Sequence, residues 1–187
     1  TLLVFLFITA WSYSPLPFGL YSAQAASVTI SGTVYSDEGS AALTTGPTVR
    51  VKVNGAGAYS AVANGSGVYS IASVTVAAGD VVTAYLDNAT ENATTLTRSD
   101  GTNNITGLNL YQNRVILRHD DAGPITNTNL DQYDSGNEGD GIDGDIGFTV
   151  TTGALTVSKD RRLYVWSGKT FTPGGAVTAC STAWATV

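Results

Sequence analysis

The 187-residue sequence has no methionine, one cysteine, one histidine and only 13% charged residues. A single cysteine cannot form an internal disulfide, so the chain is not a disulfide-stabilised scaffold. We expect Cys180 to be a small buried apolar residue, with an intermolecular disulfide as the alternative. Nine Lys and Arg residues against 15 Asp and Glu residues give a net charge of −6. This charge argues against a nucleic-acid partner, which requires a cationic protein surface.

The sequence also lacks the common catalytic motifs. It contains no Gly-x-Ser-x-Gly elbow, no phosphate-binding loop, no dinucleotide fingerprint and no Cys/His metal set. His119 is followed by Asp120 and Asp121, but neighbouring strand residues point to opposite faces. We therefore interpret His119 as a structural strand-end residue. Acidic residues are plentiful, yet nothing in the sequence singles out a pair for sugar hydrolysis. The expectation is a protein that is not an enzyme.

An apolar run occupies Leu2 to Trp11 and is too short to span a bilayer. It has the length of the apolar region of a signal peptide, and Ala23-Gln24-Ala25 offers a cleavage site. This interpretation predicts a secreted chain that meets a membrane only during export. The alternative is a retained strand that completes the sheet of a neighbouring subunit. The assembly residues would then be Leu2, Leu3, Val4, Phe5, Leu6, Phe7 and Ile8.

Beyond residue 26 the pattern is that of short strands and tight turns, with 43% hydrophobic residues available for a core. Val49, Val51 and Val53 alternate with polar residues, and the Asn54-Gly55 pair that follows favours a hairpin turn. Further along, residues 148–157 predict a hairpin with Thr152-Gly153 at its tip, and residues 163–166 predict a strand. Residues 87–104 are polar and are interpreted as a connection. The predicted fold class is all-β, with an antiparallel sandwich followed by a hairpin-rich unit.

Four segments carry a resemblance to a known family: Ile30-Ser-Gly-Thr-Val-Tyr35, Gly46-Pro-Thr-Val-Arg-Val-Lys-Val53, Gly67-Val-Tyr-Ser-Ile71 and Ala78-Gly-Asp-Val-Val-Thr-Ala-Tyr85. They resemble the carboxypeptidase-regulatory-like, or transthyretin-like, β-sandwich, whose members are mostly non-catalytic modules of secreted proteins. The resemblance implies a sandwich at 27–98. The predicted organisation is an apolar N-terminal segment at 1–26, this sandwich, and a second β unit at 99–187, which resembles β-rich segments of secreted bacterial surface proteins.

A segment rich in acidic residues and glycine lies at 131–145 within the second unit. Clustered carboxylates repel one another, and glycines allow the backbone to curl so that several oxygens converge on a cation. Calcium prefers six to eight such ligands. The spacing matches neither the EF-hand loop nor the glycine-rich nonapeptide repeats, so a solvated acidic loop is the alternative. The predicted calcium ligands are Asp134, Asn137, Glu138, Asp140, Asp143 and Asp145.

Two further patterns concern carbohydrate. Asn-x-Ser/Thr sequons predict glycosylation at Asn64, Asn88, Asn92 and Asn104. Tyr164 and Trp166 are two residues apart, so a strand places them on one face. They could stack on a sugar ring, or they could pack in the core or an interface.

The leading functional hypothesis is a subunit of an extracellular, self-assembling filament on the cell surface, held by donation of the N-terminal strand and rigidified by calcium. Its partners would be copies of itself, with glycans as a further partner. Open head-to-tail contacts of this kind produce helical filaments. The alternative is a cell-surface adhesin or carbohydrate-binding module of a larger secreted protein. A third interpretation is an accessory domain of a secreted hydrolase.

Overall fold

The computed structural model describes residues 25–133 and 144–179, and every structural statement below refers to these residues. They form an all-β fold, as predicted, with one short helix. The elements are β1 (Ala26–Tyr35), β2 (Thr48–Val53), β3 (Ala56–Val62), β4 (Val68–Val76), β5 (Ala78–Leu86), β6 (Thr94–Asp100), β7 (Leu110–Tyr111), β8 (Arg114–Leu117), α1 (Asn127–Leu130), β9 (Phe148–Thr151), β10 (Ala154–Val157), β11 (Arg162–Val165) and β12 (Val177–Ala179).

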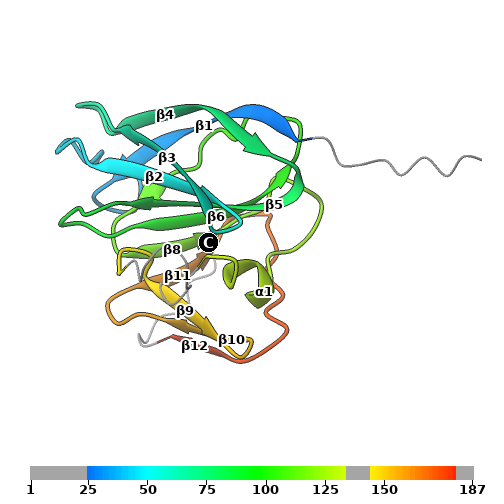
Figure 1. Cartoon of the computed structure of the whole chain (residues 1–187). Coiled ribbons are helices and arrows are strands. Elements are labelled where there is room, and N and C mark those ends of the chain that lie inside the picture. Colours follow the sequence, from blue (N-terminus) through cyan, green and yellow to red (C-terminus); the bar gives the residue numbers. More distant parts are fainter. Residues whose placement is uncertain (1–24, 134–143, 180–187) are drawn as a thin grey trace, which may run out of the picture.

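The strands form three layers (Figure 1). The middle layer is a six-stranded sheet with the order β11-β8-β6-β5-β2-β3. A three-stranded sheet, β4-β1-β7, covers one of its faces, and a second three-stranded sheet, β12-β10-β9, covers the other. The predicted antiparallel pairing holds for neighbours such as β5 and β6, but β8 pairs in parallel with both β6 and β11.

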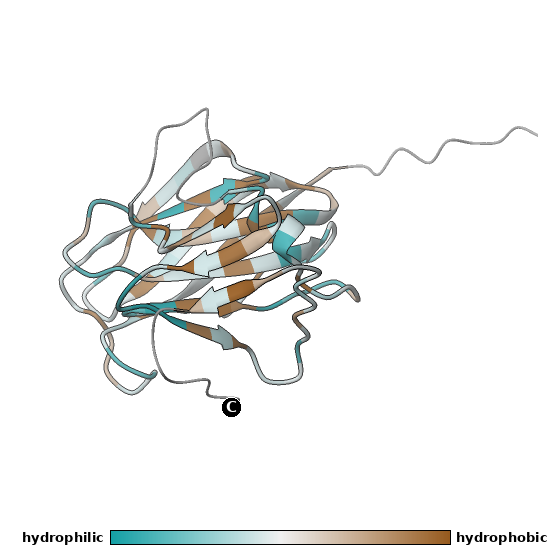
Figure 2. Ribbon diagram, turned by 90° about the horizontal axis from the view of Figure 1, so that it is seen from below, coloured by the Kyte–Doolittle hydropathy of each residue, from teal (hydrophilic) through white to brown (hydrophobic). Residues whose placement is uncertain are grey.

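Strand β5 shows why two outer layers form. Val82, Ala84 and Leu86 belong to a first core beneath β4-β1-β7. The alternate residues Val81 and Tyr85 belong to a second core above β12-β10-β9. Because successive strand residues point to opposite faces, a strand that is apolar at both sets of positions must be covered on both sides. Figure 2 shows the corresponding apolar bands along the strands.

The predicted hairpin turns are present. Asn54 and Gly55 have positive φ angles of 49° and 74° and connect β2 to β3. Thr152 and Gly153, with φ angles of 48° and 77°, connect β9 to β10 in the same way. Such paired positive angles give the turn a twist that matches the twist of the two strands. These turn residues therefore set the register of both hairpins.

The prediction of a polar connection at 87–104 was wrong for Thr94–Asp100, which form β6 within the six-stranded sheet. The physical reason is that buried threonine is tolerated when its hydroxyl is hydrogen-bonded. Thr94 donates to the Ile146 carbonyl at 2.6 Å, and Thr95 donates to the Asn109 carbonyl at 2.6 Å. The six-stranded sheet thus contains strands from both predicted units, while their division into domains stays a prediction.

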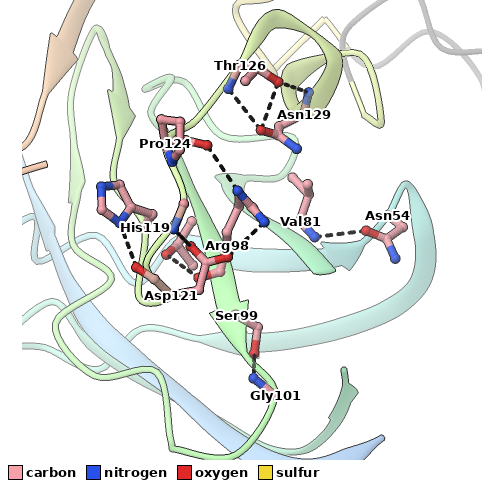
Figure 3. A network of polar contacts seen from close by, with 12 residues as sticks. Asn54, Val81, Arg98, Ser99, Gly101, His119, Asp121, Pro124, Thr126 and Asn129 are labelled. Atoms are coloured by element: carbon pink, nitrogen blue, oxygen red, sulfur yellow. Dashed lines mark hydrogen bonds and ion pairs between the residues drawn. The ribbon is translucent and has the colours of Figure 1, made fainter. Parts of the chain in front are cut away.

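The loop after β8 is fastened to β6 by Arg98 (Figure 3). Its guanidinium donates to the Pro124 carbonyl at 3.1 Å and pairs with Asp121 at 2.9 Å. His119 lies in the same loop, with Nδ1 2.8 Å from the Asp121 carbonyl oxygen and Nε2 accepting from the Thr170 amide at 3.1 Å. Both ring nitrogens of His119 are engaged in contacts that join backbone segments, and these contacts agree with the structural interpretation of His119.

We expect Gly32→Ala to destabilise the fold. A Cβ at Gly32 would lie 2.4 Å from the Leu108 carbonyl oxygen and 3.0 Å from a ring carbon of Tyr69, whose hydroxyl donates to that carbonyl. Backbone cannot move aside cheaply, so the loss should be about 1–3 kcal/mol, as for other overpacked cores. Urea unfolding measures it. Gly65→Ala is the control, because nothing lies within 4 Å of the added Cβ. Equal stability of the two variants would contradict this packing.

Candidate functional site

One face of β8 and β11 is not part of either core. Val115 and Leu117 on β8, and Leu163 on β11, point into the second core. The alternate residues on β8 are Arg114 and Ile116, which pair with Arg162 and Tyr164 of β11. On this side of the six-stranded sheet, the outer sheet β4-β1-β7 ends at β7. The alternation of the strands therefore places two arginines and an aromatic ring on a face beside the edge of the outer sheet.

A hollow of about 270 Å³ lies on this face. We call it the aromatic hollow. Its walls come from the loop after β1, from β7, from β8 and from the end of β11. The lining residues are Glu38, Tyr111, Arg114, Ile116, Tyr164, Val165, Trp166 and Ser167.

Three aromatic rings lie in series, and the last two of them line this hollow. The Tyr35 and Tyr111 rings are stacked with centroids 5.1 Å apart, and the Tyr111 and Trp166 centroids are 6.1 Å apart at an angle of 33°. Tyr111 is buried, whereas Trp166 is 39% exposed. The buried Tyr111 ring therefore holds Trp166 in place while part of the indole surface is open to a ligand.

The polar part of the hollow is built around Arg114. Its Nη1 donates to the Gln112 carbonyl at 2.8 Å, its Nη2 pairs with Glu38 Oε1, and its guanidinium carbon lies 5.4 Å from the centre of the Tyr164 ring. Arg162 reaches the same Glu38 oxygen at 3.7 Å. Arginine presents a planar fork of donors, and the contact with the Tyr164 ring helps to hold that fork in position. The hollow thus combines an exposed aromatic surface with oriented donors and acceptors.

Glu38 is placed by the loop that carries it. Asp37 Oδ1 accepts from the amides of Gly39, Ser40 and Ala41, each at 2.9 Å. The bond from the Ala41 amide, followed by those from the Ser40 hydroxyl and the Gly39 amide, holds the pKa of Asp37 well below its ordinary value of 3.8. Gly39 has φ 110°, and a Cβ there would lie 3.1 Å from the Tyr111 ring. The loop therefore lies against the aromatic series.

Sequence reasoning found part of this site. It placed Tyr164 and Trp166 on one face, and both line the aromatic hollow. It missed Glu38, Tyr111 and Arg114, which come from other elements far away in the chain. The sequence features near these residues are the turn Asp37-Glu38-Gly39 and the polar Arg114 followed by the apolar Val115. Neither feature indicates that the two segments meet in the fold. Tyr69 and Tyr85, in contrast, are each 1% exposed and pack in the interior.

Most of the predicted calcium site lies outside the described residues, namely Asp134, Asn137, Glu138, Asp140 and Asp143. Asp145 is described, and its Oδ2 accepts from the Asn88 amide at 2.7 Å. Across residues 25–133 and 144–179, no group of three or more His, Cys, Asp or Glu side chains is arranged to hold a metal. Calcium binding stays a prediction, because five of its six ligands are among the residues left undescribed.

The four predicted glycosylation residues occupy different environments. Asn64, Asn88 and Asn104 are exposed, and the Asn104 side-chain oxygen accepts from the Thr29 amide at 2.8 Å. Asn92 is half-buried, and the threonine of its sequon, Thr94, is buried in β6. A folded chain therefore presents the Asn92 sequon poorly, and modification at the four residues stays a prediction.

The predicted assembly residues, from Leu2 to Ile8, lie outside the described residues, as does Cys180. Searches against protein-family models, curated proteins and solved structures found no match to the chain. The resemblance to transthyretin-like domains at 27–98 accordingly stays a prediction. No helix in the described part of the chain has the length and apolar character needed to cross a membrane.

We expect Asp37→Ala to loosen the Glu38 loop and to destabilise the protein at neutral pH. The folded state lowers the pKa of Asp37 from 3.8, so its contribution is complete above that value and is lost as the pH falls below it. The difference in unfolding free energy between wild type and variant should therefore shrink below about pH 4.

Urea unfolding from pH 7 to pH 2.5 measures this difference. Asp131→Ala, at an exposed position after α1, controls for the loss of a carboxylate in general. A difference for Asp37→Ala that does not change with pH would show that ionised Asp37 does not organise the loop.

Proposed function

We propose that this protein is a non-catalytic glycan-binding module of a secreted or cell-surface protein, and that the aromatic hollow is its ligand site. The observation that carries the proposal is the position of Trp166, 39% exposed and backed by Tyr111, beside the Glu38–Arg114 ion pair. Sugars are amphipathic in a manner that matches this arrangement, with C–H groups on the ring face and hydroxyls at the ring edge.

The aromatic part would contribute by removing apolar surface from water. Trp166 is one of three large hydrophobic side chains that are exposed in the described residues. Stacking of a sugar face on the indole buries apolar surface on both partners, at about 25 cal/mol per Å². Because Trp166 is already held against Tyr111, little side-chain freedom is lost on binding.

The polar part would contribute orientation. Sugar hydroxyls both donate and accept, so they can bridge a carboxylate and a guanidinium. Glu38 and Arg114 present these groups side by side, and Arg114 is fixed by the Gln112 carbonyl and by Tyr164. Charge-assisted hydrogen bonds are stronger than neutral ones and depend on direction. A pocket with an apolar lining and a few placed polar groups is the usual form of a small-ligand site.

The proposal assigns no reaction to this hollow. Glu38 is the single carboxylate among its described lining residues, and it is shared by Arg114 and Arg162. Hydrolysis of a glycosidic bond ordinarily uses two carboxylates on either side of that bond. Because Glu38 is already engaged by two arginines, binding is the function that the aromatic hollow supports best.

A glycan array probed with the purified full chain tests this function, and we expect binding to a defined group of glycans. Trp166→Ala should weaken that binding at least tenfold, because it removes the stacking surface. Val62→Ala is the control, since Val62 is 67% exposed and lines neither this hollow nor its walls.

Absence of binding to any glycan, or unchanged binding by a folded Trp166→Ala, would overturn the proposal. Circular dichroism and thermal unfolding of each variant establish that it is folded.

We propose filament assembly as a second function, with residues 2–8 of one copy added as a strand to the sheet of another. One observation favours it. The six-stranded sheet ends at β3 and the outer sheet ends at β4, and the exposed side chains of Val62 and Val68 flank the loop between these two edge strands. Open strand edges pair readily with an added strand, and exposed aliphatic side chains there would gain from being covered.

Electron microscopy of the native protein at high concentration, with calcium present, tests assembly. We expect filaments in the wild type, and far fewer for Phe5→Asp with Phe7→Asp and for Val62→Lys with Val68→Lys. The control is Thr156→Lys, because Thr156 is at an exposed position on β10. Val150→Lys would not serve, because Val150 lies in the second core. Monomers alone in every wild-type preparation would refute assembly.

A further inference from the structure

Resting on the glycan-binding function proposed above, we infer that the site accommodates at least two linked sugar units and prefers an uncharged glycan. The observation behind this inference is a second hollow of about 360 Å³ beside the first. We call it the polar hollow. It is lined by Ser36, Gln112, Asn113, Arg114, Asp160 and Arg162.

Arg114 lines both hollows, so they adjoin at this residue, and we call the two together the cleft. Ligand sites commonly measure about 300–1,000 Å³. The aromatic hollow, at about 270 Å³, lies below that range, and the polar hollow, at about 360 Å³, lies near its lower end. A ligand that extends across Arg114 and fills both hollows agrees better with that range than a ligand held by either hollow alone.

The two hollows differ in the chemistry that they offer. The first presents the faces of Trp166 and Tyr164, whereas the second is lined by hydroxyl, amide, carboxylate and guanidinium groups. Two linked sugar units match these two neighbouring surfaces, because one unit can stack on Trp166 while the hydroxyls of the next unit bind the polar hollow. Arg162 is an accessible donor in the polar hollow, with a side chain that is 51% exposed.

The floor of the polar hollow is fixed by backbone contacts. Asn113 forms the turn between β7 and β8 with φ 60°, and its carbonyl accepts from the Arg162 amide at 3.0 Å. Arg161 donates from Nη1 to the Asn113 side-chain oxygen at 3.3 Å. These bonds join β11 to the turn, so the second subsite is attached to the same strands as the first.

The charges favour an uncharged glycan. Arg114 and Arg162 are balanced by Glu38 and Asp160 within the cleft, and the whole chain carries a net charge of −6. A sulfated or uronic glycan would find no surplus of positive charge in the cleft and would be repelled by the protein as a whole. Binding of an uncharged glycan should depend little on salt, since few counterions are displaced.

Isothermal titration tests the two-unit site with the uncharged glycan that gives the strongest array signal, used as one, two and three linked units. For the wild type we expect affinity to rise at least fivefold from one unit to two. Arg162→Ala should abolish most of that rise, measured as the ratio of the variant's affinity for two units to its affinity for one. Trp166→Ala should weaken all three ligands. Lys159→Ala is the control, because it removes an exposed positive charge that lines neither hollow.

The results separate the two claims. Binding of a single unit as tightly as of two, or equal weakening of both by Arg162→Ala, would overturn the two-unit site and leave the glycan-binding function standing. Tighter binding of sulfated or uronic glycans, weakened by salt, would overturn the preference for uncharged ligands. Absence of binding to every glycan on the array would overturn the proposed function and this inference together.

Discussion

The burial of both faces of the six-stranded sheet is the constraint on which the rest of the structure depends. Strand β5 carries apolar residues on both of its faces, so neither face can be left in water. Two separate outer sheets result, and each covers a different part of the middle sheet. Beneath β4-β1-β7 lie β5 and β2, whereas β8 and β11 contribute to the second core. The candidate site exists because the two outer sheets cover different parts of the middle sheet. Strands β8 and β11 have one face in the second core and the other face beside the end of the sheet β4-β1-β7.

Hydrogen bonding within the middle layer makes that burial possible. Strand β6 brings threonine and serine side chains into the interior, and such groups are costly to bury unless each hydroxyl has a partner. The bonds from Thr94 and Thr95 go to carbonyls of other segments, at Ile146 and Asn109. These hydroxyls therefore join the middle sheet to two segments that follow β6 in the sequence. Arg98 does the same for the loop at Asp121 and Pro124.

The parts that the sequence predicted correctly are those whose physics is local. Alternation of Val49, Val51 and Val53 and the turns at Asn54-Gly55 and Thr152-Gly153 depend on neighbours in the chain, and all are present. Strand β6 escaped prediction because its polarity resembles that of a loop, and the partners of its hydroxyls are far away in the sequence. The placement of Tyr164 and Trp166 on one face could be predicted from the two-residue period of a strand alone. The remainder of the site required knowing that the loop after β1 meets β8, which no local pattern indicates.

The ion pair between Glu38 and Arg114 joins residues 76 positions apart, and Arg114 lies beside Arg162 only after β11 has added in parallel to β8. Contacts between such distant segments form late, because closing a long stretch of chain has a large entropic cost before any contact is gained. The cleft consequently exists only when the loop after β1, β7, β8 and β11 are in place together. A chain in which β11 has not yet added to β8 would be unable to engage a ligand there, so occupancy of the cleft would report that these distant segments have come together.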